Sequence, residues 1–420
     1  MRIFGFDISR GARPAEQKAS AVGASLVMTP GRAVWSNRDY ASFSKEAYQQ
    51  NVVANRCIAS IAEAVASVPL TVCRGETELV TSPIGDLLAQ PNPAQGYSEY
   101  VTAVVGYLLI SGNSYQEAVT ATGAQVQELY SLRPDRMKIV PGADGMPQAY
   151  EYCVNGSRVI FDAYGEPAAI KHTRLFNPLN DWYGLAPVEA GAYAIDIHNA
   201  AMEYTQAYLG NSARPSGALV TKEKSDLSDE AFERLKAQLE DQHQGPRNAG
   251  RPMLLEGGLA WQAMGGSPKD AMLTEVKNSA ARDICLAFGV PPMLIGIPGD
   301  NTYSNYSEAR LAFWEDTVIP TLGLIVGEWN EWLAEPQGME IKPDLDAIPA
   351  IVEKRQRLWD MVEKSSVLTI NEKREAMGYD TIEGGEAMPM DTDPLAGLGP
   401  DEFNALAYGL DLETKGGRNG

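Results

Sequence analysis

The sequence predicts an α+β fold in which hairpins pack on helices and a set of long helices follows. Two observations predict it. A block from Asn113 to about Arg174 alternates apolar and polar residues between short turns, which is the pattern of half-buried strands. Helical spacing of apolar residues precedes this block and dominates the chain from Pro187 onward. Strands gathered in one part of a chain and helices in another are typical of α+β proteins.

The first predicted element is a helix over about 46–68, in which Ile58 and Ile61 lie at helical spacing. Pro69 ends this helix, because the proline ring disfavours helical geometry in the residue before it. A short strand from Leu70 to Cys73 follows.

Two shorter helices come next, and each has a start signal. Ser82 places a capping side chain before Pro83 at the first helical position. Ser98 precedes the second helix, which is expected to run to about Ile110 and to stop at Gly112.

Glycine-containing turns divide the strand block into hairpins, because glycine and asparagine adopt the backbone conformations that tight turns require. The turn signals are Thr122-Gly123, Pro141-Gly142, Asp144-Gly145 and Asn155-Gly156.

Two long helices bracket a compact insert. The first is expected to run from Pro187 to Leu209, with Gly210 as its stop, and to be roughly 35 Å long. The second is expected to run from Ser267 to Phe288. The apolar stripes are Tyr193, Ile197, Ala201, Tyr204 and Tyr208 on the first helix, and Leu273, Val276, Ala280 and Ile284 on the second.

The insert over about 215–266 is expected to contain a strand, a helix and further strands. A basic loop, exposed by its composition, contains Arg247, Asn248 and Arg251. The expected elements are a strand from Ala218 to Thr221, a helix from Asp229 to about Gln242, and strands from Met253 to Leu255 and from Leu259 to Ala263.

After Val290-Pro291-Pro292, which no helix can continue through, a polar loop leads into a third long helix that ends near Leu333. Pro320 lies inside this helix, and we expect one continuous helix bent there rather than two separate helices. The apolar stripe of this helix is Leu311, Trp314, Val318, Leu322, Ile325, Trp329 and Leu333.

Two more helices are expected near the end of the chain. The first lies near 346–364, and the second begins with a capping box from Thr369 to Glu372 and stops at Gly378. From Tyr379 onward the sequence has nine Asp or Glu against two Lys or Arg, so this tail is expected to be mostly disordered.

The formal net charge of −20 disfavours sequence-specific DNA binding, which needs a basic face to neutralise phosphates. It is compatible with DNA that only moves past the protein, and it also serves solubility. The longest apolar stretch, Val101 to Ile110, is too short to span a bilayer, so no membrane segment is expected.

Four cysteines lack CxxC spacing, and there are only three histidines. A disulfide framework and a zinc site are therefore not expected, and a reducing compartment fits best.

No catalytic motif is evident, and we expect neither an enzyme nor a cofactor. Phosphate-binding glycine loops, HExxH and GxSxG are all missing from the sequence. His198 could serve as a general base, but a polar residue on a helix face is the simpler interpretation. Cys285 lies in an apolar helical line and is expected to pack in the core. Trp314, Trp329 and Trp332 could stack on bases, but their helical spacing favours core or subunit interface.

Several short segments, in this order and spacing over roughly 46–380, resemble the portal (head–tail connector) proteins of tailed phages, closest to the long-tailed branch. Such compact portals also occur in gene transfer agents, and the sequence leaves both sources open. The segments are Tyr183-Gly184-Leu185-Ala186-Pro187, Ala213-Arg214-Pro215-Ser216-Gly217, Leu254-Leu255-Glu256-Gly257-Gly258, Phe288-Gly289-Val290-Pro291-Pro292-Met293-Leu294-Ile295-Gly296, Thr302-Tyr303-Ser304-Asn305 and Leu368-Thr369-Ile370-Asn371-Glu372.

The resemblance implies the portal fold and a division of the chain into the regions of that fold. They are a flexible arm over 1–24, a wing over 25–186, stem helices over 187–214 and 267–296 with a clip over 215–266 between them, a tunnel loop over 297–304, a kinked helix over 305–339 that returns to the wing, a short helical crown over 340–379, and the acidic tail over 380–420.

The resemblance also implies a function. Such a protein forms a dodecameric ring at one vertex of the virion head, assembled in the bacterial host cytoplasm, and double-stranded DNA passes through its channel during packaging and ejection. Its partners are further copies of itself, the major capsid protein, the large terminase subunit, which is the ATP-hydrolysing motor, and the head–tail adaptor. The implied site residues are Gly299, Asp300, Asn301, Thr302 and Tyr303 in the tunnel loop, and Arg247, Asn248 and Arg251 as the docking surface of the clip.

Two alternatives remain open. The chain could form a ring-shaped connector or scaffold without a DNA role, in which case changes at Asp300 to Tyr303 would not affect DNA retention. It could also be a hydrolase that uses His198 or Cys285, in which case substitution of either residue would abolish an activity.

Overall fold

The structure is a computed structural model of the whole chain, and it divides into two compact units, Met1–Ser36 and Asn37–Gly420. In the first unit it describes one antiparallel pair of short strands, β1 (Arg2–Ile3) and β2 (Phe6–Asp7). The residues described are 2–3, 6–7, 38–120, 125–143, 145–210, 217–221, 230, 233–234, 259–263, 272–297, 303–365 and 367–386.

The predicted helix over 46–68 is wrong in its start and in its continuity. The chain is already helical at α1 (Tyr40–Ser42) and the π-helix η1 (Phe43–Gln49), and α2 (Val52–Ala66) is a separate helix. The break occurs because Asn51 is extended and caps α2: its side-chain oxygen accepts hydrogen bonds from the backbone N–H groups of Val53 and Ala54.

A three-stranded sheet joins distant parts of the chain. The predicted strand from Leu70 is confirmed as β3 (Leu70–Arg74), and it pairs with β4 (Thr77–Glu78) on one side. On its other side it pairs with β13 (Glu340–Pro343), so that Val72 lies opposite Ile341.

The helix caps after this strand are largely as predicted. Ser82 accepts a hydrogen bond from the N–H of Gly85 and caps α3 (Pro83–Ala89). The next helix, α4 (Tyr97–Ser111), is capped by Gly96 instead, so Ser98 lies inside its first turn.

Gly112 ends α4 in the left-handed conformation, with φ 73°. A Cβ atom at this position would also lie 2.6 Å from the backbone of Gly184. Glycine is therefore required twice here, by the positive φ and by the close approach of the segment that precedes α5.

The predicted strand block is confirmed as two antiparallel sheets, with strand orders β10-β5-β6 and β7-β8-β9. Asn155 and Gly156, both at positive φ, make the tight turn between β8 and β9. The turn signal at Thr122-Gly123 lies outside the described residues. The strands are β5 (Asn113–Thr120), β6 (Val126–Leu132), β7 (Met137–Pro141), β8 (Pro147–Val154), β9 (Ser157–Asp162) and β10 (Ile170–Arg174), with the 3-10 turn η2 (Pro134–Arg136) before β7.

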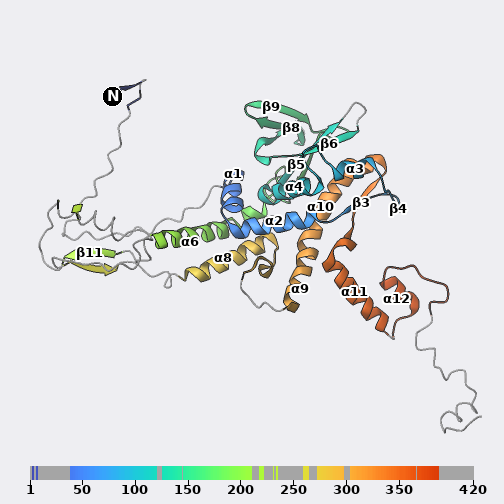
Figure 1. The fold of residues 1–420 in the computed structure, drawn as a ribbon. Helices are drawn as coiled ribbons and strands as arrows, with labels where there is room; N and C mark the ends of the chain where they lie inside the picture. The colour runs from blue at the N-terminus through green and yellow to red at the C-terminus, as the bar shows by residue number, and fades with distance from the viewer. Residues whose placement is uncertain are drawn as a thin grey trace, which may run out of the picture. The chain divides into compact units, whose positions relative to one another are not determined.

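The first long helix is divided at Gly191 into α5 (Pro187–Ala190) and α6 (Ala192–Gly210). The second is α8 (Leu273–Phe288), whose predicted start at Ser267 lies outside the described residues. The two long helices α6 and α8 pack side by side (Figure 1). Within the insert, β11 (Gly217–Thr221) and β12 (Leu259–Ala263) form two of the three expected strands and pair antiparallel. The expected strand from Met253 to Leu255 and most of the expected helix from Asp229 lie outside the described residues.

The third long helix is one uninterrupted helical run, as predicted, and it changes its winding just before Pro320. Six residues of π-helix precede the segment that contains the proline. The wider turns accommodate a residue that cannot donate a backbone hydrogen bond. The run consists of α9 (Tyr303–Ala312), η5 (Phe313–Val318), α10 (Ile319–Trp329), η6 (Asn330–Ala334) and the 3-10 turn η7 (Glu335–Gln337).

Two helices follow β13. They are α11 (Pro349–Lys364), preceded by the 3-10 turn η8 (Leu345–Ala347), and α12 (Ile370–Ala376). The predicted capping box is confirmed, because Thr369 accepts from the N–H of Glu372 while the carboxylate of Glu372 accepts from the N–H of Thr369. Of the predicted tail, residues 387–420 lie outside the described residues.

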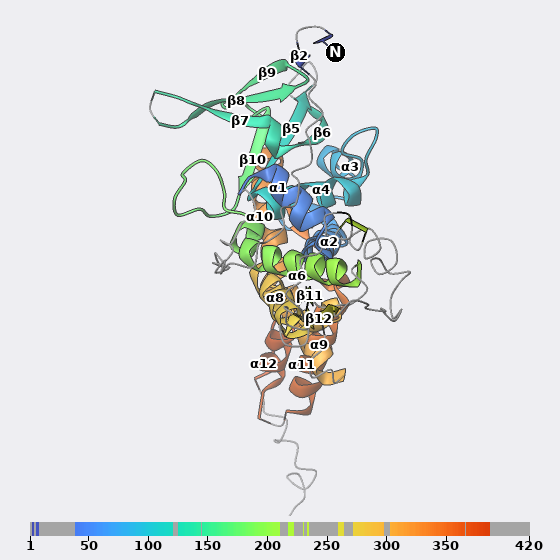
Figure 2. The ribbon, with the colours of Figure 1, turned by 90° about the vertical axis from the view of Figure 1, so that its left-hand side faces the viewer.

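The main hydrophobic core surrounds α2, whose inner face is fully buried between α4, α8 and the third helical run. In Figures 1 and 2 the strands β5 to β9 lie on one side of α2 and α4, and α8 lies on the other. A smaller core lies between the two sheets of the strand block, around Tyr115, Ile139 and Tyr150.

Candidate functional site

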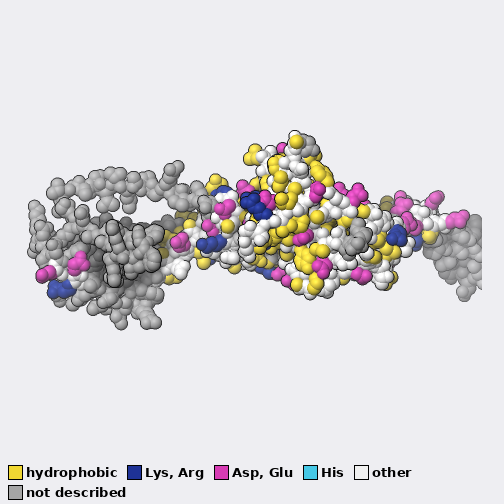
Figure 3. Space-filling view, turned by 90° about the horizontal axis from the view of Figure 1, so that it is seen from above, with side chains coloured by type: hydrophobic (Ala, Val, Ile, Leu, Met, Phe, Trp, Pro, Cys, Tyr) yellow, Lys and Arg dark blue, Asp and Glu magenta, His cyan; other side chains and the backbone are white. Residues whose placement is uncertain are grey.

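The helices α6 and α8 carry several large apolar side chains that are exposed. Tyr193 is 58% exposed. Apolar side chains clustered on one surface mark a site of association, because a soluble monomer rarely leaves such patches uncovered. Apolar side chains also reach the surface among the charged groups in Figure 3. The large exposed apolar residues of this helix pair are Tyr193, Ile197, Met202, Tyr204 and Leu209 on α6, Val276 and Leu286 on α8, and Met272 just before α8.

The predicted stripe of α6 is therefore not the face that packs within the chain. Of its five members only Ala201 is buried. The buried residues of α6 are instead Ala192, Ile195, His198 and Ala201. The helix packs against α8, whose buried residues include Ala281 and Ile284. On α6, Tyr193, Ile197 and Tyr204 lie on one face by their helical spacing, whereas Met202 and Leu209 lie on the opposite face. We call Tyr193, Ile197 and Tyr204 of α6, with Val276 and Leu286 of α8, the apolar stem face.

His198 is part of a buried polar network and not an exposed polar residue. The Nδ2 of Asn51 donates to Nδ1 of His198 at 3.2 Å and to Oδ1 of Asn199 at 2.9 Å. Asn199 in turn donates to the carbonyl of Glu46 at 3.0 Å. Burial, together with the charge of Lys277, lowers the pKa of His198. The neutral imidazole accepts through Nδ1 and ties α6 to the start of α2.

Cys285 packs in the core, as predicted. Its sulfur lies 4.0 Å from that of Cys57, and both side chains are fully buried between α2 and α8. The thiol of Cys57 donates to Cys285, and this bond together with burial raises the pKa of Cys57. The same hydrogen bond lowers the pKa of Cys285. Cys285 is still a poor candidate nucleophile, because its side chain is fully buried in the core and out of reach of a substrate.

The three tryptophans that could have stacked on bases are core residues. Trp314, Trp329 and Trp332 are all buried. The indole N–H of Trp329 donates to the side-chain oxygen of Gln116 at 2.7 Å, and the indole N–H of Trp332 donates to the carbonyl of Ala168. The hydroxyl of Tyr100 donates to the same oxygen of Gln116. Gln116 is buried, and no signal in the sequence had indicated its role.

The predicted tunnel loop is held at both ends by ordered structure. Before it, η4 (Pro292–Ile295) packs against α8 and α9, and Ile297 is buried. After it, Tyr303 is the first residue of α9. The residues Gly299, Asp300, Asn301 and Thr302 lie outside the described residues.

The end of α8, which precedes this loop, is fixed by a contact with the third helical run. Gly289 ends α8 at φ 66°, and Thr317 of η5 donates to its carbonyl at 2.6 Å. A Cβ on Gly289 would lie 2.8 Å from the hydroxyl of Thr317. The glycine of the Phe288-Gly289-Val290-Pro291-Pro292 segment is thus explained by its conformation and by this close contact.

The predicted docking residues of the insert, Arg247, Asn248 and Arg251, lie outside the described residues. The strand β11 precedes these residues in the chain and β12 follows them, and Gly217 of β11 lies opposite Ala263 of β12. This antiparallel register brings the two ends of the insert together at one place.

Among the described residues, no group of three His, Cys, Asp or Glu side chains could hold a metal ion. Within the same part of the chain, no helix combines the length and the apolar character needed to cross a membrane.

The fold and these surfaces agree with what comparison with known proteins finds. A family model described as "Phage portal protein" matches residues 52–378, which is most of the chain. This protein belongs to the phage portal protein family. The portal fold expected from the sequence is therefore confirmed.

Two relatives illustrate the range of the family. An "Uncharacterized protein" of Rickettsia bellii (strain RML369-C) is 39% identical over 350 residues, which cover 82% of this chain and 90% of the relative. The "Portal protein" of Enterobacteria phage HK97 is 23% identical over 347 residues, which cover 79% of each chain.

Solved structures show similar chains in assembled particles. A chain of "Neck of empty GTA particle computed with C6 symmetry" is 47% identical, covers 84% of this chain and 96% of that chain, and has a TM-score of 0.66. A chain of "Neck of native GTA particle computed with C12 symmetry" is 46% identical with the same coverage and a TM-score of 0.64. GTA stands for gene transfer agent. Portal proteins are structural components, so the hydrolase alternative finds no support.

Proposed function

We propose that this portal protein assembles into a dodecameric ring whose channel conducts double-stranded DNA during packaging and ejection. The observation that carries the proposal is the apolar stem face, which α6 and α8 leave uncovered in the single chain. A stable protein interface buries about 800 Å² on each partner. Two long helices offer an area of that order to a neighbour, and repetition around a closed ring covers every copy. The neck reconstructions of the similar chains, computed with sixfold and twelvefold symmetry, support the same arrangement.

In this proposal the tunnel loop faces the channel. Residues 299–303 contain one carboxylate, an amide, a hydroxyl and an aromatic ring, and no cation. Such a loop can touch DNA without holding its phosphates, since strong DNA binding needs lysine or arginine. The net charge of −20 favours the same weak contact. The ATP-hydrolysing terminase would supply the energy of translocation.

The clip is proposed to dock the large terminase subunit during packaging and the head–tail adaptor afterwards. Arg247 and Arg251, with Asn248 between them, would present positive charge and hydrogen-bond donors to acidic patches of these partners. The wing is proposed to contact the major capsid protein at one vertex of the head, where the ring is built during assembly in the bacterial host cytoplasm.

The mass and symmetry of the purified protein test the ring. Native mass spectrometry combined with two-dimensional electron-microscopy class averages is expected to show rings of about twelve subunits around a central channel. A stable monomer or dimer, both alone and in the presence of capsid protein, would contradict the proposal.

The DNA role is tested separately from assembly. We expect Asp300→Ala combined with Tyr303→Ala to leave the ring intact and to reduce the amount of DNA that particles retain after packaging. The measurement is the nuclease-protected DNA per particle. Unchanged retention in particles that carry this double variant would support a ring-forming connector without a DNA role instead.

A double charge reversal tests the docking surface. Arg247→Glu with Arg251→Glu is expected to preserve the ring but to weaken binding of terminase and adaptor, measured by co-sedimentation at low and high salt. A ring with these substitutions that binds both partners normally would rule out the clip loop as the docking site.

A further inference from the structure

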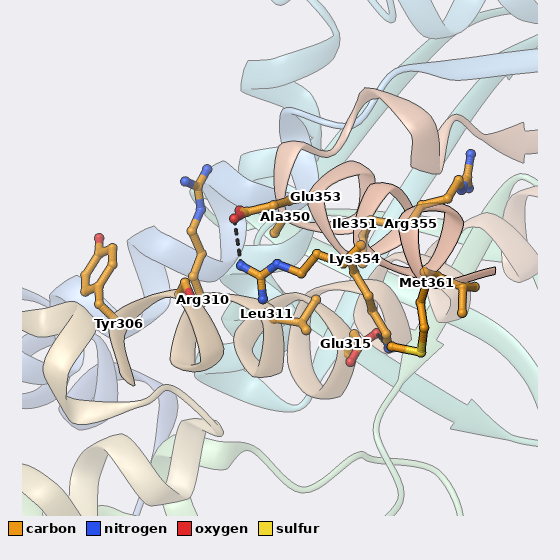
Figure 4. Close-up of a pocket in the computed structure, with 13 residues that line it drawn as sticks. Tyr306, Arg310, Leu311, Glu315, Ala350, Ile351, Glu353, Lys354, Arg355 and Met361 are labelled. Atoms are coloured by element: carbon orange, nitrogen blue, oxygen red, sulfur yellow. Dashed lines mark hydrogen bonds and ion pairs between the residues drawn. The ribbon is translucent and has the colours of Figure 1, made fainter. Parts of the chain in front are cut away.

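A groove of about 620 Å³ lies between α9 and α11, close to the C-terminal end of the described chain. Its floor is apolar and consists of Leu311 from α9 and Ala350, Ile351, Leu358 and Met361 from α11. Leu358 is 46% exposed and Met361 is 69% exposed. Figure 4 shows Arg310 and Leu311 of α9 on one side of the groove, and Ile351, Lys354 and Met361 of α11 on the other.

The rim of the groove is basic. Four cationic side chains line it, against the two carboxylates of Glu315 and Glu353. This local excess of positive charge stands out in a chain whose net charge is −20. The four cations are Arg310, Lys354, Arg355 and Arg357.

Part of this positive charge is available to a ligand. Lys354 pairs with Glu315, Arg357 pairs with Glu353 at 2.7 Å, and Arg355 pairs with Asp346. These pairs lie at the surface, where such pairs contribute little and can exchange partners. Arg310 is exposed, and no carboxylate within the described residues pairs with it. An occupant with carboxylates beside apolar side chains would complement both the rim and the floor.

The chain itself contains a segment of that composition. Residues 401–413 contain four carboxylates and no lysine or arginine. Phe403, Leu406, Ala407 and Leu410 are spaced so that a helix would place them on one face, with Asp401 and Glu402 in its first turn. Acidic residues stabilise the first turn of a helix. We call residues 401–413 the acidic segment.

The described chain ends against α11, the helix that forms one wall of the groove. The ring of Tyr379 lies 6.4 Å from that of Trp359 of α11, which does not line the groove, and α12 packs against α11. From Glu386, fifteen further residues reach Asp401, and at most about 3.5 Å per residue this connection can span about 50 Å. A tethered segment meets its site at an effective concentration in the millimolar range.

We propose that the acidic segment of the same chain occupies the groove between α9 and α11. Its apolar face would cover Leu358 and Met361, and its carboxylates would pair with Arg310 and Arg357. The match to the portal family ends at residue 378, so the acidic segment lies beyond the matched part of the chain, whereas the groove lies within it. This inference does not depend on whether the ring conducts DNA.

Cross-linking within the full-length chain tests the proposal. Met361→Cys and Phe403→Cys are combined in a Cys153→Ser background, because the other three native cysteines are buried. A short bismaleimide is expected to link the two new cysteines within one chain about tenfold faster than in either control. One control pairs Met361→Cys with Lys415→Cys, beyond the acidic segment, and the other pairs Val159→Cys on β9 with Phe403→Cys.

Charge exchange supplies the second arm of the test. Arg310→Glu with Arg357→Glu is expected to reduce the rate of cross-linking to that of the controls, and Asp401→Lys with Glu402→Lys is expected to restore it in the same chain. Equal rates in the test pair and the controls would overturn the proposal. Cross-links only between chains would also overturn it, and would assign the groove to a neighbouring copy.

Discussion

At the scale of single residues, polar side chains buried between elements determine how the core is joined. Asn51 uses its side-chain oxygen to cap α2, which leaves its amide nitrogen to donate to His198 and Asn199. His172 is also neutral, because burial, followed by the charge of Arg174, lowers its pKa to about 3. Its ring stacks on Tyr115 at 4.3 Å, and its Nε2 lies 3.0 Å from Oδ1 of Asn113. In both cases the imidazole serves packing and hydrogen bonding, not proton transfer.

Replacement of Asn51 is expected to be costly. Asn51→Ala removes the cap of α2 and leaves Nδ1 of His198 without its donor, with an expected loss of about 2–3 kcal/mol of stability. The measurement is chemical denaturation followed by tryptophan fluorescence. Asn55→Ala is the matched control, because Asn55 makes one exposed hydrogen bond to the carbonyl of Tyr48. Equal effects of the two substitutions would contradict the role assigned to Asn51.

The lowered pKa of His172 predicts acid sensitivity. The unfolded chain protonates this residue below about pH 6.5, whereas the folded chain does so only near pH 3. The unfolded state therefore binds more protons in this window. Stability is fully present above about pH 6.5 and falls as the pH is lowered toward 3, by about 2 kcal/mol at pH 5 from this residue alone.

The measurement is the unfolding free energy of the chain and of His172→Gln between pH 8 and pH 4. The variant is expected to be less stable at pH 8 but to lose less stability on acidification. An identical pH dependence of the two proteins would show that His172 is not the group that titrates.

At the scale of elements, the junctions between helices depend on contacts that neighbouring residues alone do not specify. Gly289 ends α8 against Thr317, which lies in the π-helical part of the third helical run. Lys171 of β10 joins the strand block to the same run through ion pairs of 2.7 Å with Glu328 and 2.8 Å with Glu331. These contacts join the end of α8 and the strand block to the same helical run.

Gly289→Ala is expected to destabilise the chain more than Gly296→Ala does. Both glycines have positive φ, but a Cβ on Gly296 would meet nothing within 4 Å. The control therefore reports backbone strain of about 1 kcal/mol alone. Gly289→Ala adds the clash with Thr317, and Thr317→Ala in the same chain should recover part of that difference in thermal unfolding. No recovery would contradict the steric explanation.

At the scale of the whole molecule, the single chain leaves uncovered what an assembly would bury. The apolar stem face is exposed in the single chain, although apolar surface of this kind is normally removed from water. The net charge of −20 would oppose unspecific association of such subunits, because like charges repel. Ring formation and the groove between α9 and α11 are separate uses of exposed apolar surface, and they can be tested independently.

A double charge substitution on the apolar stem face is expected to prevent ring closure. Ile197→Glu with Tyr204→Glu would place two carboxylates on the apolar stem face in each subunit interface, at a cost of several kcal/mol per contact. The measurement is the fraction of rings in native mass spectra. Val80→Glu is the control, since Val80 is 98% exposed and belongs to neither α6 nor α8. Normal rings from the double variant would remove the stem face from the interface.

Local signals in the sequence determined much of the secondary structure, because caps, stops and tight turns depend on adjacent residues. Ser82, the capping box at Thr369 and the Asn155-Gly156 turn are all as predicted. The order of short motifs also identified the family and its fold. The predicted tunnel and clip residues, apart from the start of α9 at Tyr303, lie outside the described residues, so their roles remain predictions.

Only the tertiary structure decided the features that depend on residues distant in sequence. The helical pattern located the apolar stripe of α6, but a stripe does not specify whether its partner is the same chain or a neighbour. The pairing of β13 with β3 joins positions near 72 and 341, and the break at Asn51 follows from a network that reaches His198. The physical reason is common to all three. Hydrophobic burial and hydrogen bonding stabilise any two surfaces that meet in space, whether or not they are close in sequence. The periodicity of a segment shows only that one of its faces is apolar, and does not show which surface that face packs against.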